Sequence, residues 1–246
     1  MHEDGSDIEV FDKDAANNSG YLYTQTARLS CKLATQRTTD IILETGELQK
    51  KSVLDLACGD GFYSARFWDF GAISQLVCAD PAFNAVKVAA NRSGPRPVSF
   101  LVSDAHLLPF RNDSFQAVLI QSVLHHDNDP LHMIREAFRV APRVLIHEPN
   151  GNNLGLKVIE RVSRYHIEHG EKSYSSRRMK RWIEEAGGSV ISERCAGFVP
   201  MFCPDWMAKL MKSAEPAVER VPLLRWAACA VYVMVAVRNG APADGV

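Results

Sequence analysis

The sequence predicts an α/β fold in which helices cover both faces of a parallel sheet. Five short apolar runs of strand length alternate with segments of helical periodicity. An apolar run without polar alternation is typical of a parallel strand that is buried on both faces. The runs are 52–57, 76–79, 98–102, 115–120 and 143–147, with helices expected at 61–71, 81–92 and 130–140. This order predicts a doubly wound, Rossmann-like sheet.

The pattern changes after residue 149. Helical segments are expected at 154–172, 173–186 and 201–226, and strands at 189–199 and 229–237. The two late strands are separated by the last helical segment, so they could pair with each other and extend one edge of the sheet.

Composition limits the class of protein. The chain has 246 residues, and 28 Lys and Arg against 29 Asp and Glu give a net charge of −1, which argues against a protein that coats nucleic acid. Six scattered cysteines without a C-x-x-C pair predict no structural zinc site and a reducing, cytoplasmic location. The apolar run 226–237 is much shorter than the roughly 20 residues of a membrane-spanning helix.

The chain is expected to divide into three parts. Residues 1–20 are acidic, lack the pattern of a signal peptide, and are expected to be mobile. Residues 21–238 are expected to form one domain, in which 50–150 bind a cofactor and 154–226 supply helical insertions and a strand on the substrate side. Residues 239–246 form a tail.

The strongest motif is the run VLDLACGDG at 53–61, where the first strand ends in a turn of small residues. Such a turn allows the backbone to approach a ligand closely. Asp80 ends the next strand about 20 residues later, where an acid can accept hydrogen bonds from ribose hydroxyls. A dinucleotide dehydrogenase would need a third glycine at position 64, which is Ser64. Asp60 would also repel a pyrophosphate.

A third acid, Asp104, follows the third strand. Together, VLDLACGDG, CADP, SDAHLLPF and NDSFQAVLIQSVLHH resemble the class I S-adenosylmethionine-dependent methyltransferases over about residues 50–150. The resemblance implies a seven-stranded sheet with a reversed last strand and an N-terminal helical lid. The sequence departs from the family pattern at Ala57, where the family often has glycine.

The resemblance implies S-adenosyl-L-methionine as cofactor and S-adenosyl-L-homocysteine as product. Ala57 and Gly59 would frame the methionine end, Asp80 would bind the ribose, and Asp104 would meet the adenine. The predicted cofactor-binding residues are Tyr21, Asp55, Ala57, Cys58, Gly59, Asp80, Pro81, Asp104, Ala105 and Gln121. No metal site is predicted.

The acceptor side is predicted from the ends of the fourth and fifth strands. His125 or His126 is the candidate general base, although either could instead cap a helix. Glu148 could bind or orient the acceptor, or serve the structure alone. The basic and aromatic segment 154–182 is interpreted as a lid for an anionic acceptor, or as a solvated helix face.

We therefore expect methyl transfer to an oxygen or nitrogen of a small molecule, such as a sugar, a glycan precursor or a secondary metabolite. No nucleic-acid partner and no membrane span are expected, and the sequence leaves the oligomeric state open. The alternatives are an RNA or protein methyltransferase and a catalytically silent cofactor-binding module.

Overall fold

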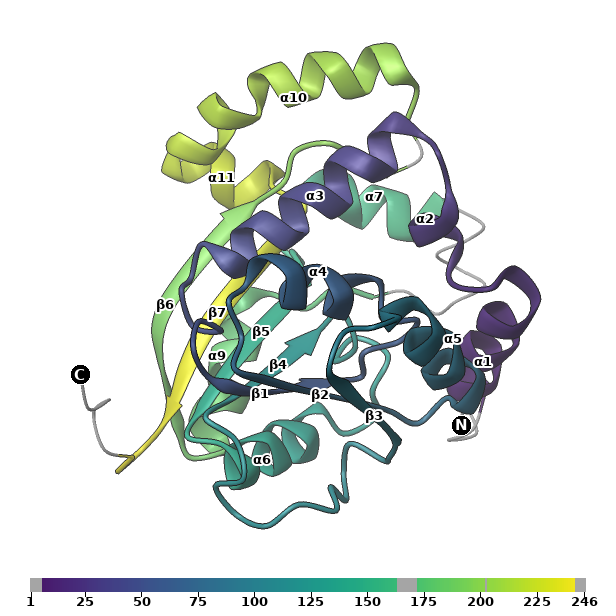
Figure 1. The fold of residues 1–246 in the computed structure, drawn as a ribbon. Coiled ribbons are helices and arrows are strands. Elements are labelled where there is room, and N and C mark those ends of the chain that lie inside the picture. Colours follow the sequence, from purple (N-terminus) through teal and green to yellow (C-terminus); the bar gives the residue numbers. More distant parts are fainter. Residues whose placement is uncertain (1–5, 163–171, 202, 242–246) are drawn as a thin grey trace.

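A computed structural model describes residues 6–162, 172–201 and 203–241. Seven strands form one sheet in the order β3-β2-β1-β4-β5-β7-β6 (Figure 1). They are β1 Ser52–Leu56, β2 Gln75–Asp80, β3 Val98–Val102, β4 Ala117–Gln121, β5 Arg143–Pro149, β6 Gly188–Ala196 and β7 Val231–Arg238. Only β7 among them runs antiparallel to its neighbours β5 and β6. The predicted seven-stranded sheet with a reversed last strand is therefore confirmed.

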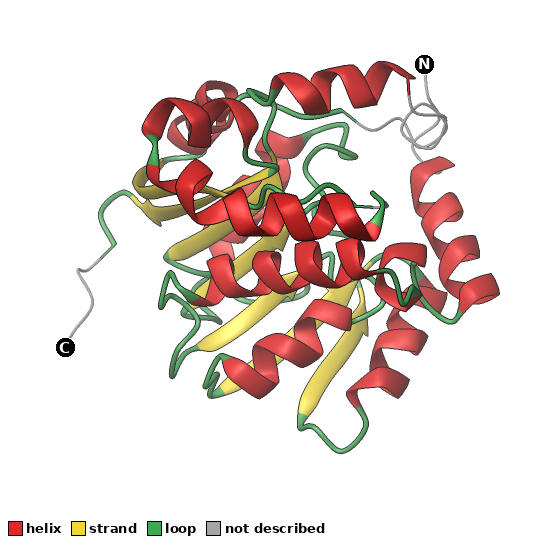
Figure 2. Ribbon diagram, turned by 90° about the horizontal axis from the view of Figure 1, so that it is seen from above, coloured by secondary structure: helices red, strands yellow, loops and turns green. Residues whose placement is uncertain are grey.

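Helices lie on both faces of this sheet (Figures 1 and 2). The described helices are α1 Ser6–Asn18, α2 Leu22–Gln25, α3 Leu29–Leu43, α4 Phe62–Phe70, α5 Phe83–Ser93, α6 Pro130–Val140, α7 Leu154–Val162, α9 Ser176–Glu185, α10 Asp205–Arg220 and α11 Pro222–Ala228. Helices α3 and α4 pack on one face, and α6 and α9 pack on the other. Within the described ranges, no helix is long and apolar enough to cross a membrane.

The two packed faces explain why the strands read as continuous apolar runs. In β1, Leu54 belongs to the core beneath α6 and α9, whereas Val53 belongs to the core beneath α3 and α4. In β4, Ile120 and Leu119 divide between the two cores in the same way. Because successive side chains of a strand point to opposite faces, both sets must be apolar.

One expectation about the chain's local structure needs correction. Strand β4 begins at Ala117, not at Phe115, because Phe115 packs edge-on against Phe110 with ring centroids 4.9 Å apart. Residues 6–18, expected within a mobile N-terminus, form helix α1 against α5. The carboxylate of Asp12 on α1 accepts hydrogen bonds from the backbone N–H and the side-chain amide of Asn84, at 2.6 and 2.8 Å.

The late strands pair as expected. Strand β6 lies beside β7, and β7 lies beside β5, so the pair extends the sheet at the edge opposite β3. The expected helix 154–172 is described as far as Val162, and residues 163–171 lie outside the described residues. Helices α10 and α11 connect β6 to β7 and lie above the carboxyl ends of the parallel strands (Figure 1).

The turn after β1 requires glycine where α4 begins. Gly61 has φ of +70°, and a Cβ atom there would lie 2.7 Å from Cβ and 2.8 Å from Cα of Ala89 on α5. Gly46 has a similar φ of +74°, but a Cβ atom there would meet nothing within 4 Å. Replacing each glycine by alanine therefore distinguishes two contributions to the free energy of unfolding. Gly46 reports the backbone conformation alone, and Gly61 reports the backbone conformation and the close packing together.

We predict that Gly46→Ala lowers the free energy of unfolding by about 1 kcal/mol, because only the left-handed backbone is penalised. Gly61→Ala should lower it by about 2 kcal/mol more, because α4 and α5 must also separate. Urea unfolding followed by circular dichroism measures both values. Equal losses for the two variants would contradict the close-packing role of Gly61.

Candidate functional site

A cavity of about 1180 Å³ opens at the carboxyl ends of the parallel strands. Ligand sites in proteins typically span about 300–1,000 Å³, so this cavity has room for a cofactor and a second molecule. The lining includes His125, His126 and all of the predicted cofactor-binding residues, namely Tyr21, Asp55, Ala57, Cys58, Gly59, Asp80, Pro81, Asp104, Ala105 and Gln121. Glu148 does not line the cavity.

Asp80 joins two turns at the floor of the cavity. One carboxylate oxygen accepts the N–H of Gly59 at 2.8 Å, and the other accepts the N–H of Ala82 at 2.9 Å. Each oxygen can accept a further hydrogen bond, as a pair of ribose hydroxyls would require. Ala57 and Gly59 both have positive φ, 61° and 55°, so Ala57 adopts the conformation for which the family often has glycine.

Two buried acids lie side by side beneath the turn after β1. Burial raises the pKa of Asp80 to about 6 and also raises that of Asp55 to about 6. A hydrogen bond of 2.6 Å from the Ser64 hydroxyl to Asp55 opposes the shift of Asp55. Both carboxyl groups therefore change charge close to neutral pH, and hydrogen-bond donors from a ligand would favour their ionised forms.

Asp60 holds the N-terminal segment over the cavity. Its Oδ2 accepts hydrogen bonds from the Tyr21 N–H at 3.0 Å, from the Thr24 hydroxyl at 2.6 Å and from the Arg92 guanidinium at 3.0 Å. The Tyr21 ring consequently lies against Gly59, where a Cβ atom would come within 2.6 Å of it. Asp60 thus anchors a lid, a role that the sequence did not indicate.

Asp104 is tied to the loop after β4 by a histidine that the sequence analysis did not assign. Asp104 Oδ1 accepts the backbone N–H of His106 at 2.8 Å and lies 3.1 Å from its Nδ1. His106 Nε2 lies 3.2 Å from Asp127 Oδ1. These contacts lower the pKa of Asp104, so this acid is charged at neutral pH. His106 belongs to the SDAHLLPF motif, and this position two residues after Asp104 could have indicated its role in the site.

His125 and Glu148 form a buried pair. His125 Nδ1 lies 2.6 Å from Glu148 Oε2, and Glu148 Oε1 accepts the N–H groups of Val123 and Leu124, each at 2.9 Å. Burial alone would raise the pKa of Glu148, but His125 and the two N–H groups lower it. Glu148 therefore orients His125 and does not itself reach the cavity.

His126 lies beside this pair under the N-terminal helix. Its ring centroid is 4.0 Å from that of His125 and 4.9 Å from that of Phe11 on α1. His147, on β5, also lines the cavity, and burial lowers its pKa to about 4, so this imidazole is neutral at pH 7. The sequence analysis assigned no role to His147.

The part of the cavity beyond β4 is largely apolar. Its lining includes Ala34, Leu156, Phe198, Val199, Pro200, Met201, Met211, Ala227, Ala228 and Val231. These residues come from α3, α7, α10, α11, β7 and the loop after β6. Because they are far apart in the sequence, no sequence motif predicts them. We call this part the apolar chamber.

The basic segment 154–182 does not reach the cavity with its described charges. The cavity lining contains no lysine or arginine among the residues that the structure describes. Lys157 and Lys180 instead pair with Glu160 and Glu193. Residues 163–171, including the predicted lid residues Tyr165 and His166, lie outside the described residues. In the part of the chain that is described, no three metal-ligating side chains are grouped for an ion.

Comparison with known proteins shows what part of this domain is similar to. Residues 54–143, less than half of the chain, match the family model of the methyltransferase domain. The predicted resemblance to the class I S-adenosylmethionine-dependent methyltransferases is confirmed over this segment.

Individual relatives agree with this class. The chain is 34% identical over 101 residues to a demethylmenaquinone methyltransferase of Renibacterium salmoninarum, covering 41% of this chain and 40% of that protein. The chain thus matches only about two fifths of that relative's length.

Two solved structures share the fold. One is magnesium protoporphyrin IX methyltransferase from Synechocystis with bound S-adenosylhomocysteine. It has a TM-score of 0.63 at 17% sequence identity, and the match covers 94% of this chain and 100% of that chain. The cyclase SpnF has a TM-score of 0.65 at 20% identity, covering 95% and 93% of the two chains. Because SpnF is named a cyclase, the shared fold alone does not fix the reaction.

We predict that Asp80→Ala weakens S-adenosylmethionine binding about tenfold to a hundredfold, since hydrogen bonds to a carboxylate are lost. Affinity of the parent protein should also fall as the pH drops through about 6, where Asp80 takes up a proton. Isothermal titration calorimetry measures both effects. Asp69→Ala, which removes an acid paired with Arg96 outside the cavity, is the control. Unchanged affinity in Asp80→Ala would contradict the ribose-binding role.

Proposed function

We propose that this protein transfers a methyl group from S-adenosylmethionine to an apolar small molecule that carries a ring hydroxyl. The observation that carries the proposal is the position of the His125–Glu148 pair between two unlike halves of one cavity. The polar half lies over β1 and β2, and the apolar chamber lies over β5 and β7. The sheet order puts β4, whose end carries His125, between these halves.

The polar half fits the proposed cofactor. Asp80 offers two carboxylate oxygens that are already fixed by backbone N–H groups, and the turn at Ala57 and Gly59 lets the backbone approach closely. Asp104 lies at the far rim, fixed by His106. S-adenosylmethionine supplies an electrophilic methyl group on a sulfonium. The protein's task is then to hold a nucleophile in line with that methyl group.

In the proposed mechanism, His125 takes the proton from the acceptor hydroxyl. The ionised Glu148 fixes the ring through Nδ1 and stabilises the positive charge that develops on the imidazole. Because Glu148 engages Nδ1, Nε2 is the ring nitrogen that we propose accepts the proton. Deprotonation makes the hydroxyl oxygen, and the ring carbon beside it, a stronger nucleophile. The lid formed by Phe11 and Tyr21 excludes water from the transfer.

The lining of the chamber favours an apolar acceptor over the anionic sugar expected from the sequence. No described lysine or arginine contacts the cavity, so a phosphate or carboxylate would lose its hydration without a counter-charge. The named relative acts on demethylmenaquinone, and an apolar ring compound of that kind suits the chamber. The same absence of basic side chains speaks against RNA as the acceptor.

The proposed location is a reducing compartment such as the cytoplasm. All six cysteines are free, including the buried Cys31, Cys78, Cys203 and Cys229. Secreted proteins commonly use such residues in disulfides, whereas cytoplasmic proteins keep them reduced.

The acceptor class is tested with labelled cofactor. When the protein is incubated with methyl-labelled S-adenosylmethionine and a bacterial extract, we expect the label to move into the fraction soluble in organic solvent. Product analysis by mass spectrometry and nuclear magnetic resonance then decides between the oxygen and the ring carbon. Label confined to the aqueous small molecules or to RNA would contradict an apolar acceptor, and an absence of any transfer would favour the silent module.

Glu148→Gln tests the general base. Glutamine can still accept the N–H groups of Val123 and Leu124 but carries no charge, so turnover should fall about 100-fold with cofactor affinity unchanged. His125→Ala should lose turnover to a similar extent.

Glu193→Gln is the matched control, because Glu193 pairs with Lys180 outside the cavity. Full turnover in Glu148→Gln would place the base elsewhere.

A further inference from the structure

The helices that roof the apolar chamber expose large apolar side chains to solvent. On α10, Trp206 is 68% exposed and Leu210 is 63% exposed. On α11, Leu223 is 73% exposed and Trp226 is 50% exposed. Val221 and Leu224 between them are also exposed, and α10 and α11 are in contact. Large exposed apolar side chains grouped on adjacent helices are typical of a surface that binds another protein or a membrane.

These side chains follow one face of α10. At 3.6 residues per turn, Trp206, Leu210 and Arg220 fall on the same side of the helix, with Lys209 beside them. Lys209 and Arg220 are exposed as well. We define the roof face as Trp206, Lys209, Leu210, Arg220, Val221, Leu223, Leu224 and Trp226.

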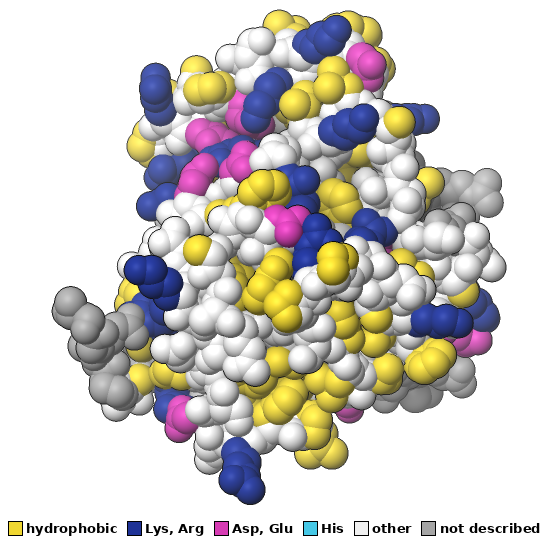
Figure 3. Space-filling view, in the orientation of Figure 1, with side chains coloured by type: hydrophobic (Ala, Val, Ile, Leu, Met, Phe, Trp, Pro, Cys, Tyr) yellow, Lys and Arg dark blue, Asp and Glu magenta, His cyan; other side chains and the backbone are white. Residues whose placement is uncertain are grey.

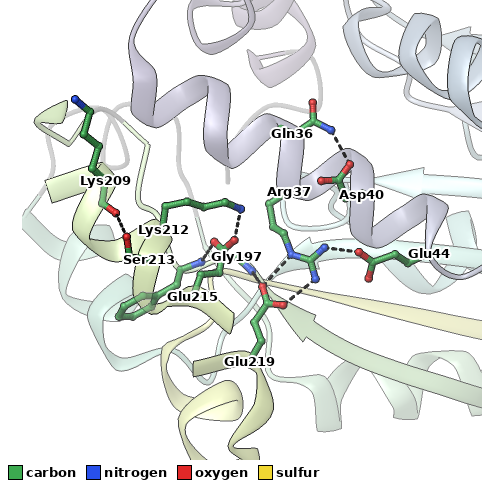
Figure 4. A network of polar contacts seen from close by, with 11 residues as sticks. Gln36, Arg37, Asp40, Glu44, Gly197, Lys209, Lys212, Ser213, Glu215 and Glu219 are labelled. Atoms are coloured by element: carbon green, nitrogen blue, oxygen red, sulfur yellow. Dashed lines mark hydrogen bonds and ion pairs between the residues drawn. The ribbon is translucent and has the colours of Figure 1, made fainter. Parts of the chain in front are cut away.

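Two of the three acids of α10, Glu215 and Glu219, are turned away from the roof face. Glu215 is buried, where it accepts the N–H of Phe198 and pairs with Lys212. Glu219 receives two hydrogen bonds from Arg37 on α3, at 2.9 and 2.8 Å. Figure 4 shows both acids reaching inward from α10, whereas Lys209 extends away from them. The exposed charges of α10 are therefore those of Lys209 and Arg220, together with Asp205 in the first turn.

The composition of the roof face identifies its partner. Tryptophan and leucine on one side of a helix, flanked by lysine and arginine, are typical of helices that lie in the interface of a lipid bilayer. Figure 3 shows hydrophobic, basic and acidic side chains over the upper part of the molecule, where Figure 1 places α10. Anionic lipid headgroups would pair with Lys209 and Arg220, and the acyl region would accept Trp206 and Leu210.

The inner side of the same helices strengthens this inference. Met211 of α10 and Ala227 and Ala228 of α11 line the apolar chamber, so one layer of helix separates the chamber from the roof face. Leu154 and Val158 of α7, which contacts α11, are 72% and 58% exposed and extend the apolar surface. The apolar chamber and the roof face therefore lie on opposite sides of the same two helices.

We propose that the roof face docks on an anionic lipid bilayer. The docking itself does not depend on catalysis, whereas its use in delivering the acceptor rests on the proposed function. If the protein binds vesicles but transfers no methyl group, the docking role of the roof face stands and the proposed reaction is contradicted.

Vesicle binding tests the proposal in the absence of cofactor. We expect the full chain to sediment with vesicles of phosphatidylcholine and phosphatidylglycerol, and less with phosphatidylcholine alone. The double variant Trp206→Ser, Leu210→Ser should bind at least about tenfold more weakly, because apolar area no longer enters the bilayer. Phe70→Ser removes an equally exposed side chain, 66% exposed, at the opposite end of the strands and should bind like the parent.

A second variant separates charge from apolar contact. Lys209→Gln, Arg220→Gln should weaken binding to anionic vesicles and leave the weak binding to phosphatidylcholine unchanged. Circular dichroism and cofactor affinity check that each variant is folded. An absence of vesicle binding, or equal binding by the Trp206 and Phe70 variants, would overturn the proposal. A dimer that dissociates on Trp206→Ser, Leu210→Ser would assign the roof face to a second copy of the chain instead.

Discussion

The bonds from Gly59 and Ala82 to the carboxylate of Asp80 are the constraint on which the site depends. They bind the end of β2 to the two turns that shape the floor of the cavity. A left-handed turn at Ala57 and Gly59 would cost conformational energy in isolation, and the buried acid offsets this cost. The position of everything above the floor, including the lid, follows from this junction of two parallel strands.

The order of the strands in the sheet separates the polar lining of the cavity from its apolar lining. Strands β1 and β2 carry the polar groups, while β5 and β7 and the helices above them carry the apolar wall. A buried charge such as Glu148 needs full hydrogen bonding, and two N–H groups and His125 satisfy it. The imidazole therefore stands in a fixed orientation at the border of the two halves before any ligand arrives.

Much of this could be predicted from sequence because it depends on local order. The strands are marked by apolar runs. Asp80 ends β2, and Asp104 and His125 lie in the loops after β3 and β4, at the same edge of the sheet. The apolar chamber could not be predicted, since Ala34, Phe198 and Ala228 are distant in sequence and meet only through the packing of α3 and α11 on the late strands. The direction of the charges in the basic segment could not be predicted for a related reason, because composition does not show which way a side chain points.

Asp60 has a consequence for the timing of the cycle. Three donors converge on its carboxylate, and together they fasten the segment that lays Tyr21 across Gly59. A ligand bound beneath Tyr21 could leave on this side only after these bonds part.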